Sequence, residues 1–528
     1  METELQELPI SVQSFRKLRD NNYLYVDKTK DIFNIAKNEK SYFLSRPRRF
    51  GKSLLISTLE NLFLGNKELF KDLYIHDKWD WNGTYPVIRI DLGERSHKTG
   101  EELKRSLNIF LTEMAEENNI KLNYENHNDK FGELIKKLHK TQNKKVVVLI
   151  DEYDKPILDN ISYPDVRGVM KEILHDFYQI LKSQDDNLRF LFITGVTRFV
   201  GTSIFSGLNS PDDITLNNKF PTICGYTQSE LEHYFKPYMD VLAKEVNLGV
   251  NELLVGIKDW YNGYSWNGEN FVYNPQSILS LFNNMFFNNY WFKTGTPTFL
   301  LKILKTKTNL NKILNQVEAG FEISDSYDPE NIPIIPLMFQ SGYLTISKKE
   351  TIDLKPKYTL DIPNKEVNDS LIKYLLNIYI DYPLNDVDSL RNRMRTNFLN
   401  KDSENLNLNL REMIANVPYQ LHLDKEKYYH SIFLLWLNLL GFEIDGEISA
   451  DKGRMDATLI IDKEAFIIEI KFSKDANKID ALIDEALNQI KNKKYYEKYL
   501  KYNINFLGVV FADKEVKCKF KKINSLYY

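Results

Sequence analysis

The chain has 528 residues, of which 43% are hydrophobic, and its formal net charge is −3. This length allows roughly three to four domains with real cores, and a charge so near neutral excludes a global field that would attract nucleic acid. Cys224 and Cys518 are its two cysteines, which excludes a disulfide framework or a cysteine zinc cluster. No apolar run approaches the roughly 18 residues that span a bilayer, so we expect a cytoplasmic protein without membrane attachment.

A short apolar stretch, residues 42–44, runs into the basic turn RPRRFGKS and then into LLISTLENLF, which has helical spacing. The closing Gly-Lys-Ser is typical of a phosphate-binding loop, in which backbone N–H groups and a lysine meet the phosphates and a hydroxyl ligates Mg²⁺. The helix that follows would direct its N-terminal dipole at the same anion. The residues expected to bind ATP here are Arg48, Arg49, Phe50, Gly51, Lys52, Ser53 and Leu54, with Ser53 on the metal. The aromatic lead-in NNYLYVDKTKDIF is expected to be a cap beside the nucleotide or an entry helix.

The loop departs from the full pattern G-x-x-x-x-G-K-[ST] at one position, because Arg46 stands where the first glycine is expected. A side chain at this turn leaves the rate of ATP hydrolysis open. Two alternatives also stay open: a basic turn that merely caps a helix, and a loop whose fold is kept while Arg46 blocks phosphate placement.

The segment VVVLIDEYD, residues 146–154, supplies the acids that such a loop requires. Its successive apolar residues predict a central parallel strand that is covered on both faces. Asp151 would hold Mg²⁺ at the carboxyl end of this strand, and Glu152 would polarise the attacking water. A further strand over LRFLFITGVT would bring Thr194 to the γ-phosphate. Arg198 is expected to be a charge sensor, a finger toward a neighbouring subunit or an ordinary surface arginine.

With PVIRIDLG as another strand, these patterns predict an α/β domain over 1–225, a P-loop NTPase parallel sheet with helices on both faces. Residues 226–350 are mainly helical and aromatic, which predicts a helical lid or winged-helix-like region. Its aromatic residues are expected to form a structural corner, with stacking on bases as the alternative; they are Trp260, Tyr261, Tyr264 and Trp266. Residues 351–420 predict a helical linker.

A second chemical site is predicted in 421–528, at GRMDATLIIDKEAFIIEIKF. A turn at Asp462 folds two strands into a hairpin, and period-two alternation puts Glu469 and Lys471 on one strand face. Asp456 reaches the same edge from the partner strand. Two carboxylates make a site for Mg²⁺ or Mn²⁺, and the lysine would orient the water that attacks a phosphodiester. A surface ion pair on an ordinary hairpin is the alternative.

Weaker candidates lie around this hairpin. Glu426 and His430 sit four positions apart on the preceding helix pattern. The basic stretches at 491–502 and 514–522 are expected to be solvated faces, with nucleic-acid contact as the alternative.

The loop RPRRFGKSLL resembles that of the STAND and archaeal-type ATPases of the AAA superfamily. A larger ordered set resembles the bacterial AAA-ATPase-like proteins that end in a PD-(D/E)XK nuclease domain: YVDKT, LIDEYDKPI, TGVTRF, ICGYT, WYNGY and YWFKTGTPTFL. The resemblance implies the nucleotide roles given above for Lys52, Ser53, Asp151 and Glu152. In that family the first glycine of the loop is commonly replaced. It also implies an α/β restriction-endonuclease-like domain in which Gln489 of a later helix approaches Asp456, Glu469 and Lys471.

Together these expectations describe an ATP-binding protein whose nucleotide state gates a metal-dependent nuclease, with DNA expected ahead of RNA as substrate. Assembly into a homo-oligomer and a setting in genome or anti-phage defence are further expectations, the latter by analogy alone. The alternative from another class is a nucleotide-switched regulator or scaffold that binds nucleic acid or protein without cleavage.

Overall fold

The computed structural model describes residues 5–198, 211–291, 317–320, 323, 333–380, 386–415, 433–434, 436–437, 440, 442–450, 453–512 and 515–522. The chain divides into two compact units, Met1–Asn368 and Asp369–Tyr528. The two candidates Glu426 and His430 lie outside the described residues. Among the residues that are described, no helix has both the length and the apolar character needed to cross a bilayer.

The first unit is built on a parallel sheet with the strand order β2-β3-β4-β1-β5. Every residue of β3 is buried, as expected for a central strand with helices on both faces. The α/β fold predicted for this part of the chain is therefore confirmed. The strands are β1 (Ser41–Ser45), β2 (Val87–Asp91), β3 (Val146–Asp151), β4 (Leu188–Gly195) and β5 (Asp212–Asp213).

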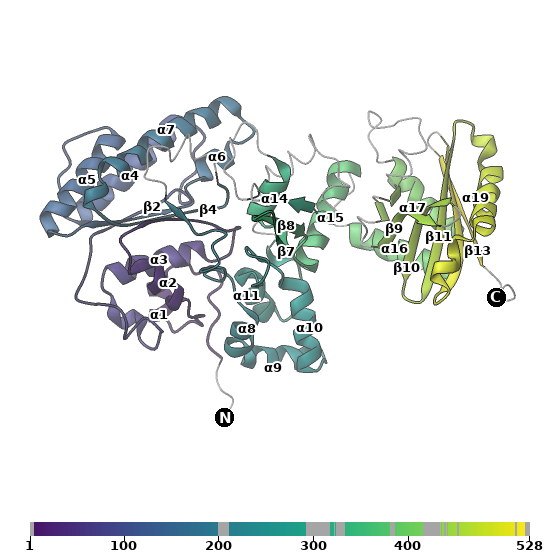
Figure 1. Ribbon diagram of the computed structural model, residues 1–528, viewed down its shortest axis with the longest axis horizontal. Helices are drawn as coiled ribbons and strands as arrows, with labels where there is room; N and C mark the ends of the chain where they lie inside the picture. The colour runs from purple at the N-terminus through teal and green to yellow at the C-terminus, as the bar shows by residue number, and fades with distance from the viewer. Residues whose placement is uncertain are drawn as a thin grey trace. The chain divides into compact units, whose positions relative to one another are not determined.

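Helices cover both faces of this sheet (Figure 1). One layer holds α1 (Phe15–Asp20), α2 (Thr29–Ala36) and α3 (Lys52–Phe63). The other holds α4 (Gly100–Glu117), α5 (His127–Gln142) and α7 (Pro164–Ser183), and the short α6 (Lys155–Asp159) follows β3. Because parallel strands end at one edge, the segments after β1, β3 and β4 meet there.

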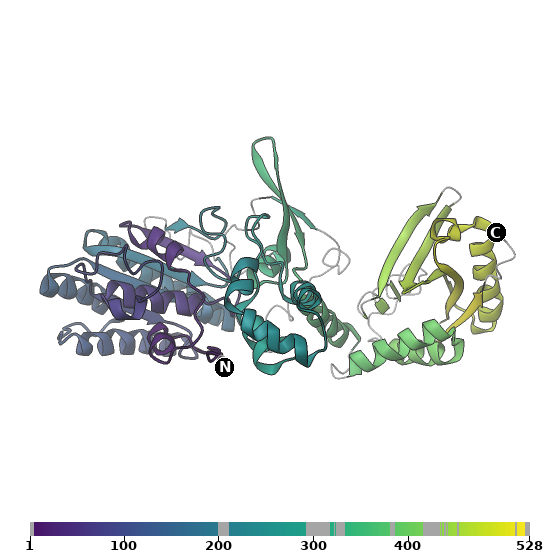
Figure 2. The same cartoon turned by 90° about the horizontal axis from the view of Figure 1, so that it is seen from below.

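Four helices follow the sheet and share a hydrophobic core with Leu24 and Val26 of the lead-in. They are α8 (Gln228–Tyr234), α9 (Lys236–Glu245), α10 (Val250–Tyr261) and α11 (Pro275–Asn284). An antiparallel sheet begins in the expected helical region and ends just beyond it. Its strands are β6 (Val317–Ala319), β8 (Lys355–Asp361) and β7 (Thr345–Ile352), and α14 (Ile334–Ser341) lies between β6 and β7 in the sequence. Figure 2 shows β7 and β8 as a long projecting hairpin.

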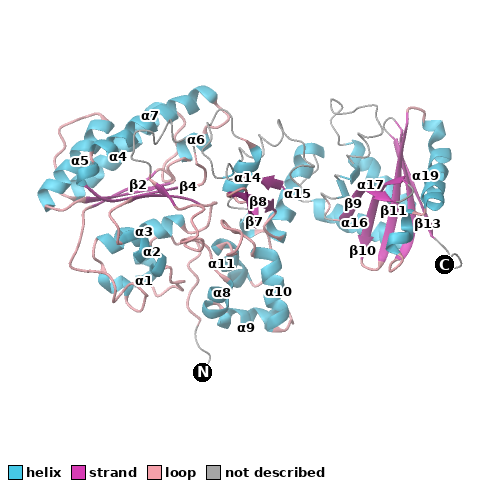
Figure 3. Cartoon of the chain, viewed as in Figure 1, coloured by secondary structure: helices cyan, strands magenta, loops and turns pink. Residues whose placement is uncertain are grey.

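Helix α15 (Lys365–Ile380) begins in the first unit, and its residues from Asp369 onward belong to the second. The expected linker range thus holds the end of a hairpin and three helices, the other two being α16 (Val387–Asn400) and α17 (Ser403–Ala415). The second unit has a mixed sheet of order β13-β12-β11-β10-β9 (Figure 3). Its strands and later helix are β9 (Glu443–Ala450), β10 (Gly453–Ile461), β11 (Glu464–Ser473), α19 (Ile479–Lys493), β12 (Asn503–Ala512) and β13 (Glu515–Lys522).

Alternation along β11 sorts its side chains between two layers. Ala465 and Ile467 share a core with α19, whereas Phe466 packs against Phe398 of α16, with ring centroids 5.2 Å apart. Glu469 and Lys471 have the parity of Ala465, so the period of two carries them to the face beneath α19. The strand pattern thereby determines which helix can contact them.

Candidate functional site

The phosphate-loop sequence forms a turn between β1 and α3. Its left-handed residues are Arg49, with φ 68°, and Gly51, with φ 87°, so Arg46 is not required to adopt the glycine-like conformation. The Lys52 ammonium donates to the backbone oxygens of Arg46 and Pro47, both at 2.9 Å. Burial lowers the pKa of Lys52, while the charge of Glu152 opposes that shift. In the described part of the chain, Lys52 is paired with its own loop and has no carboxylate at hydrogen-bond distance.

Arg46 points away from this turn and is completely buried. Its guanidinium donates to the backbone oxygens of Ser45 (2.8 Å) and Thr215 (2.9 Å) and lies 4.0 Å from the ring centroid of Trp266. Burial lowers the pKa of Arg46 to about 10. The arginine at the first-glycine position thus anchors the loop to residues after β5 and does not fill the space over Lys52.

The aromatic corner expected in the middle region packs on this loop. Tyr261, Tyr264 and Trp266 are buried, and the Phe50 ring lies edge-on to Tyr264 at 4.8 Å and to Trp266 at 5.4 Å. Buried rings cannot stack on bases, so for these three residues that alternative is wrong. Sequence reasoning missed the contact of Tyr264 and Trp266 with the loop, because nothing in the local pattern links residues more than 200 positions apart.

A cavity of about 340 Å³ opens beside the loop. Its lining includes the loop residues Arg48, Arg49, Gly51, Lys52, Ser53 and Leu54, together with Glu152 and Lys155. A smaller cavity of about 70 Å³ shares Gly51 and Leu54 with the first and is lined mostly by apolar residues of the lead-in and by Ile223 and Cys224. The two cavities offer a cationic end and an apolar end that meet at the loop.

Asp151, at the carboxyl end of β3, meets Thr194 of the neighbouring strand β4, as expected from their positions. Asp151 is buried, and its Oδ1 accepts from Thr194 Oγ1 at 2.5 Å. Among the described residues Asp151 Oδ2 has no hydrogen-bond partner. This oxygen is therefore suited to bind a cation or a water molecule. Thr194 therefore contacts Asp151 of the neighbouring strand. It does not line the cavity, where it was expected to meet the γ-phosphate.

Glu152 has a left-handed backbone, with φ 50°, and lines the cavity. A methyl group added at Gly93 would lie 2.5 Å from Glu152 Oε2 and 2.9 Å from Asp91 Oδ1, so the missing side chain makes room for the glutamate. Burial raises the pKa of Glu152, and the charge of Lys52 opposes this shift. Asp91 has a pKa of about 6, raised by burial and then by the charge of Asp151.

Gly93→Ala is therefore expected to displace the Glu152 carboxylate without unfolding the chain, because the far end of a flexible side chain can move. If Glu152 positions the attacking water, ATP hydrolysis should fall about 100-fold, the typical cost of misplacing a reacting group by an ångström. The assay is single-turnover ATP hydrolysis with a parallel binding measurement. Gly168→Ala is the matched control, since nothing lies within 4 Å of its added methyl group, and equal rates for both variants would contradict the role of Glu152.

The second aspartate of DEYD, Asp154, which sequence reasoning did not single out, has a structural role. Asp154 accepts from the backbone N–H groups of Val196 (3.0 Å) and Thr197 (2.7 Å). It joins the ends of β3 and β4 and so holds Asp151 beside Thr194. Arg198 Nη1 lies 2.7 Å from Asp213 Oδ2, so its charge is engaged outside the cavity lining.

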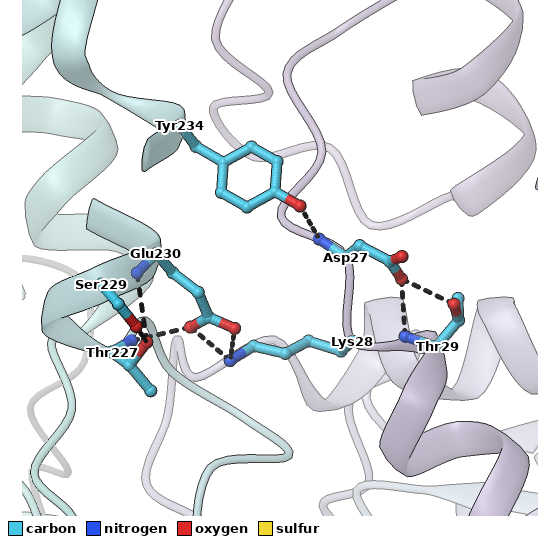
Figure 4. A network of polar contacts seen from close by, with 7 residues as sticks. All are labelled: Asp27, Lys28, Thr29, Thr227, Ser229, Glu230 and Tyr234. Carbon is cyan, nitrogen blue, oxygen red and sulfur yellow. Dashed lines mark hydrogen bonds and ion pairs between the residues drawn. The ribbon is translucent and has the colours of Figure 1, made fainter. Parts of the chain in front are cut away.

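The lead-in is joined to α8 by a network of polar contacts (Figure 4). Lys28 Nζ donates to both carboxylate oxygens of Glu230, at 2.7 and 2.6 Å, and Glu230 also closes a capping box with Thr227. Asp27 accepts from Thr29 and donates its backbone N–H to the Tyr234 hydroxyl. The YVDKT segment thus contacts α8 through Asp27 and Lys28 and also lines the apolar cavity.

In the second unit the structure brings Asp456, Glu469, Lys471 and Gln489 together. The pairing of β10 with β11 runs from Ala457 to Ile461, so Asp456 lies just before its first paired residue. Its side-chain Oδ2 accepts the Ile470 backbone N–H at 2.8 Å. Lys471 Nζ donates to Gln489 Oε1 at 2.8 Å and lies 3.7 Å from Glu469 Oε1. Gln489 Nε2 in turn donates to Glu469. The hairpin supplies three members and α19 the fourth.

Glu469 is the most strongly perturbed member of this group. Burial, followed by the charge of Asp456, raises its pKa to about 8, and its Oε2 has no partner among the described residues. In the same described part no His, Cys, Asp and Glu side chains form a group of three or more suited to a metal. The two carboxylates fit a divalent ion that takes its remaining ligands from water and phosphate, as Mg²⁺ commonly does.

Two lysines of the basic stretch on β13 form ion pairs with acids of α19. Lys517 Nζ lies 2.5 Å from Asp480 and Lys519 Nζ 3.4 Å from Asp484, both on α19. These two lysines serve the packing of α19 beside the edge strand, as expected for a solvated face.

Comparison with known proteins assigns both parts of the chain. Residues 9–205 match the family described as "Predicted AAA-ATPase", and residues 424–521 match the PD-(D/E)XK nuclease superfamily. An "Uncharacterized protein in vnfD 5'region" from Azotobacter chroococcum mcd 1 is 36% identical over 515 residues, which cover 96% of each chain.

Two solved structures of the Drosophila origin recognition complex with DNA and Cdc6 have chains of low similarity. One is 11% identical with a TM-score of 0.25, and the matched part covers 81% of this chain and 60% of that one. The other is 12% identical with a TM-score of 0.24, covering 80% of this chain and 58% of that one. Neither likeness is close enough to bear on the fold.

The match across nearly the full length of a relative, the two family assignments and the geometry of both sites agree. The chain belongs to the family of proteins that join an AAA-ATPase-like domain to a C-terminal PD-(D/E)XK nuclease-superfamily domain.

Proposed function

We propose that the protein binds ATP in the first unit and that its nucleotide state gates metal-dependent cleavage of DNA by the second. The observation that carries this proposal is that two sets of residues, far apart in the sequence, are each assembled around a buried carboxylate oxygen with no hydrogen-bond partner in the described part of the chain, Asp151 Oδ2 and Glu469 Oε2. A buried carboxylate oxygen without a hydrogen bond costs free energy unless a ligand supplies one. Cleavage of foreign nucleic acid in genome defence is the setting we propose, by analogy.

In the first unit, the phosphates would lie in the cationic cavity and the base in the apolar one. Lys52 would turn from the loop carbonyls to the β- and γ-phosphates, and Ser53 and Asp151 would hold Mg²⁺, which neutralises charge on the transferred phosphoryl group. Thr194 keeps Asp151 oriented through its 2.5 Å hydrogen bond. Glu152 would accept the proton of the attacking water.

In the second unit, Asp456 and Glu469 would hold Mg²⁺ or Mn²⁺, which polarises the scissile phosphate and lowers the pKa of a bound water. Lys471 would orient that water, and Gln489 keeps both Lys471 and Glu469 in place through its amide. Because Glu469 has a pKa of about 8 without metal, binding of the ion would release a proton near neutral pH.

A chain of buried hydrogen bonds from the phosphate loop to Glu366 supports the gating part of the proposal. The Trp291 indole N–H donates to the backbone oxygen of Arg48 in the phosphate loop (3.1 Å), and its backbone N–H donates to Glu366 Oε1 (2.6 Å). The other oxygen of Glu366 accepts from Ser277 of α11 (2.7 Å), and Gln276 and Leu279 of that helix line the phosphate cavity. Burial raises the pKa of Glu366 to about 7.

Glu366 lies in the first turn of α15, the helix that runs on into the second unit. Two contacts from the rim of the nucleotide site therefore converge on one carboxylate at the start of the connecting helix. A loop that rearranges around phosphates would alter the Trp291 contact and so bias the position of α15.

Trp291→Phe is expected to uncouple cleavage from nucleotide, because phenylalanine keeps most of the packing and loses the indole donor. The ATP-dependent change in cleavage rate should shrink about tenfold, corresponding to loss of one buried hydrogen bond. The measurement is DNA cleavage with ATP, with ADP and without nucleotide. Trp79→Phe is the control, since Trp79 Nε1 has no partner among the described residues.

The proposal as a whole is tested by incubating the wild type with DNA and RNA of several topologies, Mg²⁺ or Mn²⁺, and each nucleotide state. Cleavage that changes with nucleotide supports it. Intact substrates in every condition, together with binding of ATP and nucleic acid, would favour a nucleotide-switched regulator without cleavage.

A further inference from the structure

Lys155 is a second lysine at the phosphate cavity. Its side chain lines the cavity that Lys52, Ser53 and Glu152 also line, and its backbone N–H donates to the Glu152 carbonyl at 3.0 Å. The turn from β3 into α6 therefore fixes Lys155 beside the glutamate. The other cations in the lining, Arg48, Arg49 and Lys52, all belong to the phosphate loop.

The present partner of Lys155 is weakly bound. Nζ lies 2.7 Å from Asp159 Oδ2, one helical turn further on, and the two side chains are 27% and 36% exposed. An exposed pair of this kind contributes little to stability, because water and salt screen it and two side chains must be ordered. A phosphate oxygen within reach would compete effectively for the ammonium.

A triphosphate has the greatest need for charge at its γ-phosphoryl end. In phosphoryl transfer the oxygens of that group are commonly met by a second cation in addition to the loop lysine. Arg198, the arginine singled out by sequence, is engaged with Asp213 at 2.7 Å and is absent from the cavity lining. Lys155 approaches from the turn after β3 that also carries Glu152, the side on which the γ-phosphate would lie.

We propose that Lys155 is a ligand of the γ-phosphate and that it lets the site distinguish ATP from ADP. This inference rests on the proposed function, because it requires the cavity to bind the phosphates of a nucleotide. It assigns the readout of nucleotide state to a residue outside the phosphate loop. Asp159 holds the lysine when no γ-phosphate is present.

Calorimetric titration with ADP and with ATPγS, each with Mg²⁺, tests the proposal. The wild type should bind ATPγS more tightly than ADP. Lys155→Ala should lose about 10- to 100-fold of its affinity for ATPγS, the range for a hydrogen bond to a charged group, and keep its affinity for ADP. Asp159→Asn should keep the preference for ATPγS, because the lysine remains.

Lys104→Ala is a matched control, because it removes a lysine from another exposed intrahelical pair, Lys104 with Glu101 at 2.9 Å. Equal affinities of the wild type for both nucleotides, or equal losses for both in Lys155→Ala, would overturn the role of Lys155 while ATP binding stood. A wild type that binds neither nucleotide would overturn the proposed function and this inference together.

Discussion

Replacing Lys471 with alanine is expected to abolish DNA cleavage and to leave nucleotide binding intact. The ammonium is held at Gln489 Oε1 (2.8 Å) and near Glu469 (3.7 Å), so it is positioned before substrate arrives. Loss of a positioned group that handles the attacking water typically costs about 10²- to 10⁴-fold in rate. The measurement is single-turnover cleavage with Mg²⁺ or Mn²⁺ beside a binding assay with a labelled ATP analogue.

Two variants sharpen this test. Lys463→Ala removes an exposed lysine from the turn between β10 and β11 and should cleave at the wild-type rate. Glu469→Ala should lose Mn²⁺ binding in a calorimetric titration, because it removes one of the two expected carboxylate ligands. Cleavage by Lys471→Ala at the wild-type rate would show that the group is an ordinary ion pair on a hairpin.

Lys52→Ala is expected to weaken ATP binding by about 100-fold or more, because a charge-assisted contact to the phosphates is lost in a confined site. The same variant should make cleavage insensitive to ATP, since the nucleotide state can no longer be read. Fluorescence titration with a labelled ATP analogue measures the first effect, and the cleavage assay with and without ATP measures the second.

The control must separate binding from folding, because Lys52 also satisfies the backbone oxygens of Arg46 and Pro47. Thermal unfolding of the nucleotide-free proteins therefore accompanies the titration, and only a variant with the wild-type Tm is interpreted. Lys78→Ala removes an exposed lysine that lies over the Tyr74 ring and should bind normally. ATP affinity unchanged in Lys52→Ala would place the nucleotide elsewhere, with Arg46 and the loop serving only as a structural platform.

Much of the architecture followed from local pattern. The buried run of β3 and the alternation in β11 predicted a covered parallel strand and a two-faced hairpin strand, and both are confirmed. Period-two geometry also predicted that Glu469 and Lys471 share a face. These predictions succeed because side-chain direction in a strand depends only on position along it.

The direction of the Arg46 side chain did not follow from pattern. A loop consensus says which backbone positions must be permissive, whereas the guanidinium is held by Thr215 and Trp266, 169 and 220 positions later. Gly93 is a similar case, because its importance to Glu152 depends on the neighbour relation between β2 and β3.

The sequence by itself determined the chemical groups of the protein: a lysine and a hydroxyl at a strand-to-helix turn, acids at the end of a buried strand, and a second pair of acids with a lysine on a hairpin. Tertiary structure decided which of them meet and what orients them, namely Thr194 on Asp151, Gln489 on Glu469, and Trp291 between the phosphate loop and Glu366. The physical reason is that spacing along one strand or helix is set by local backbone geometry, whereas contacts between distant segments depend on how whole layers pack.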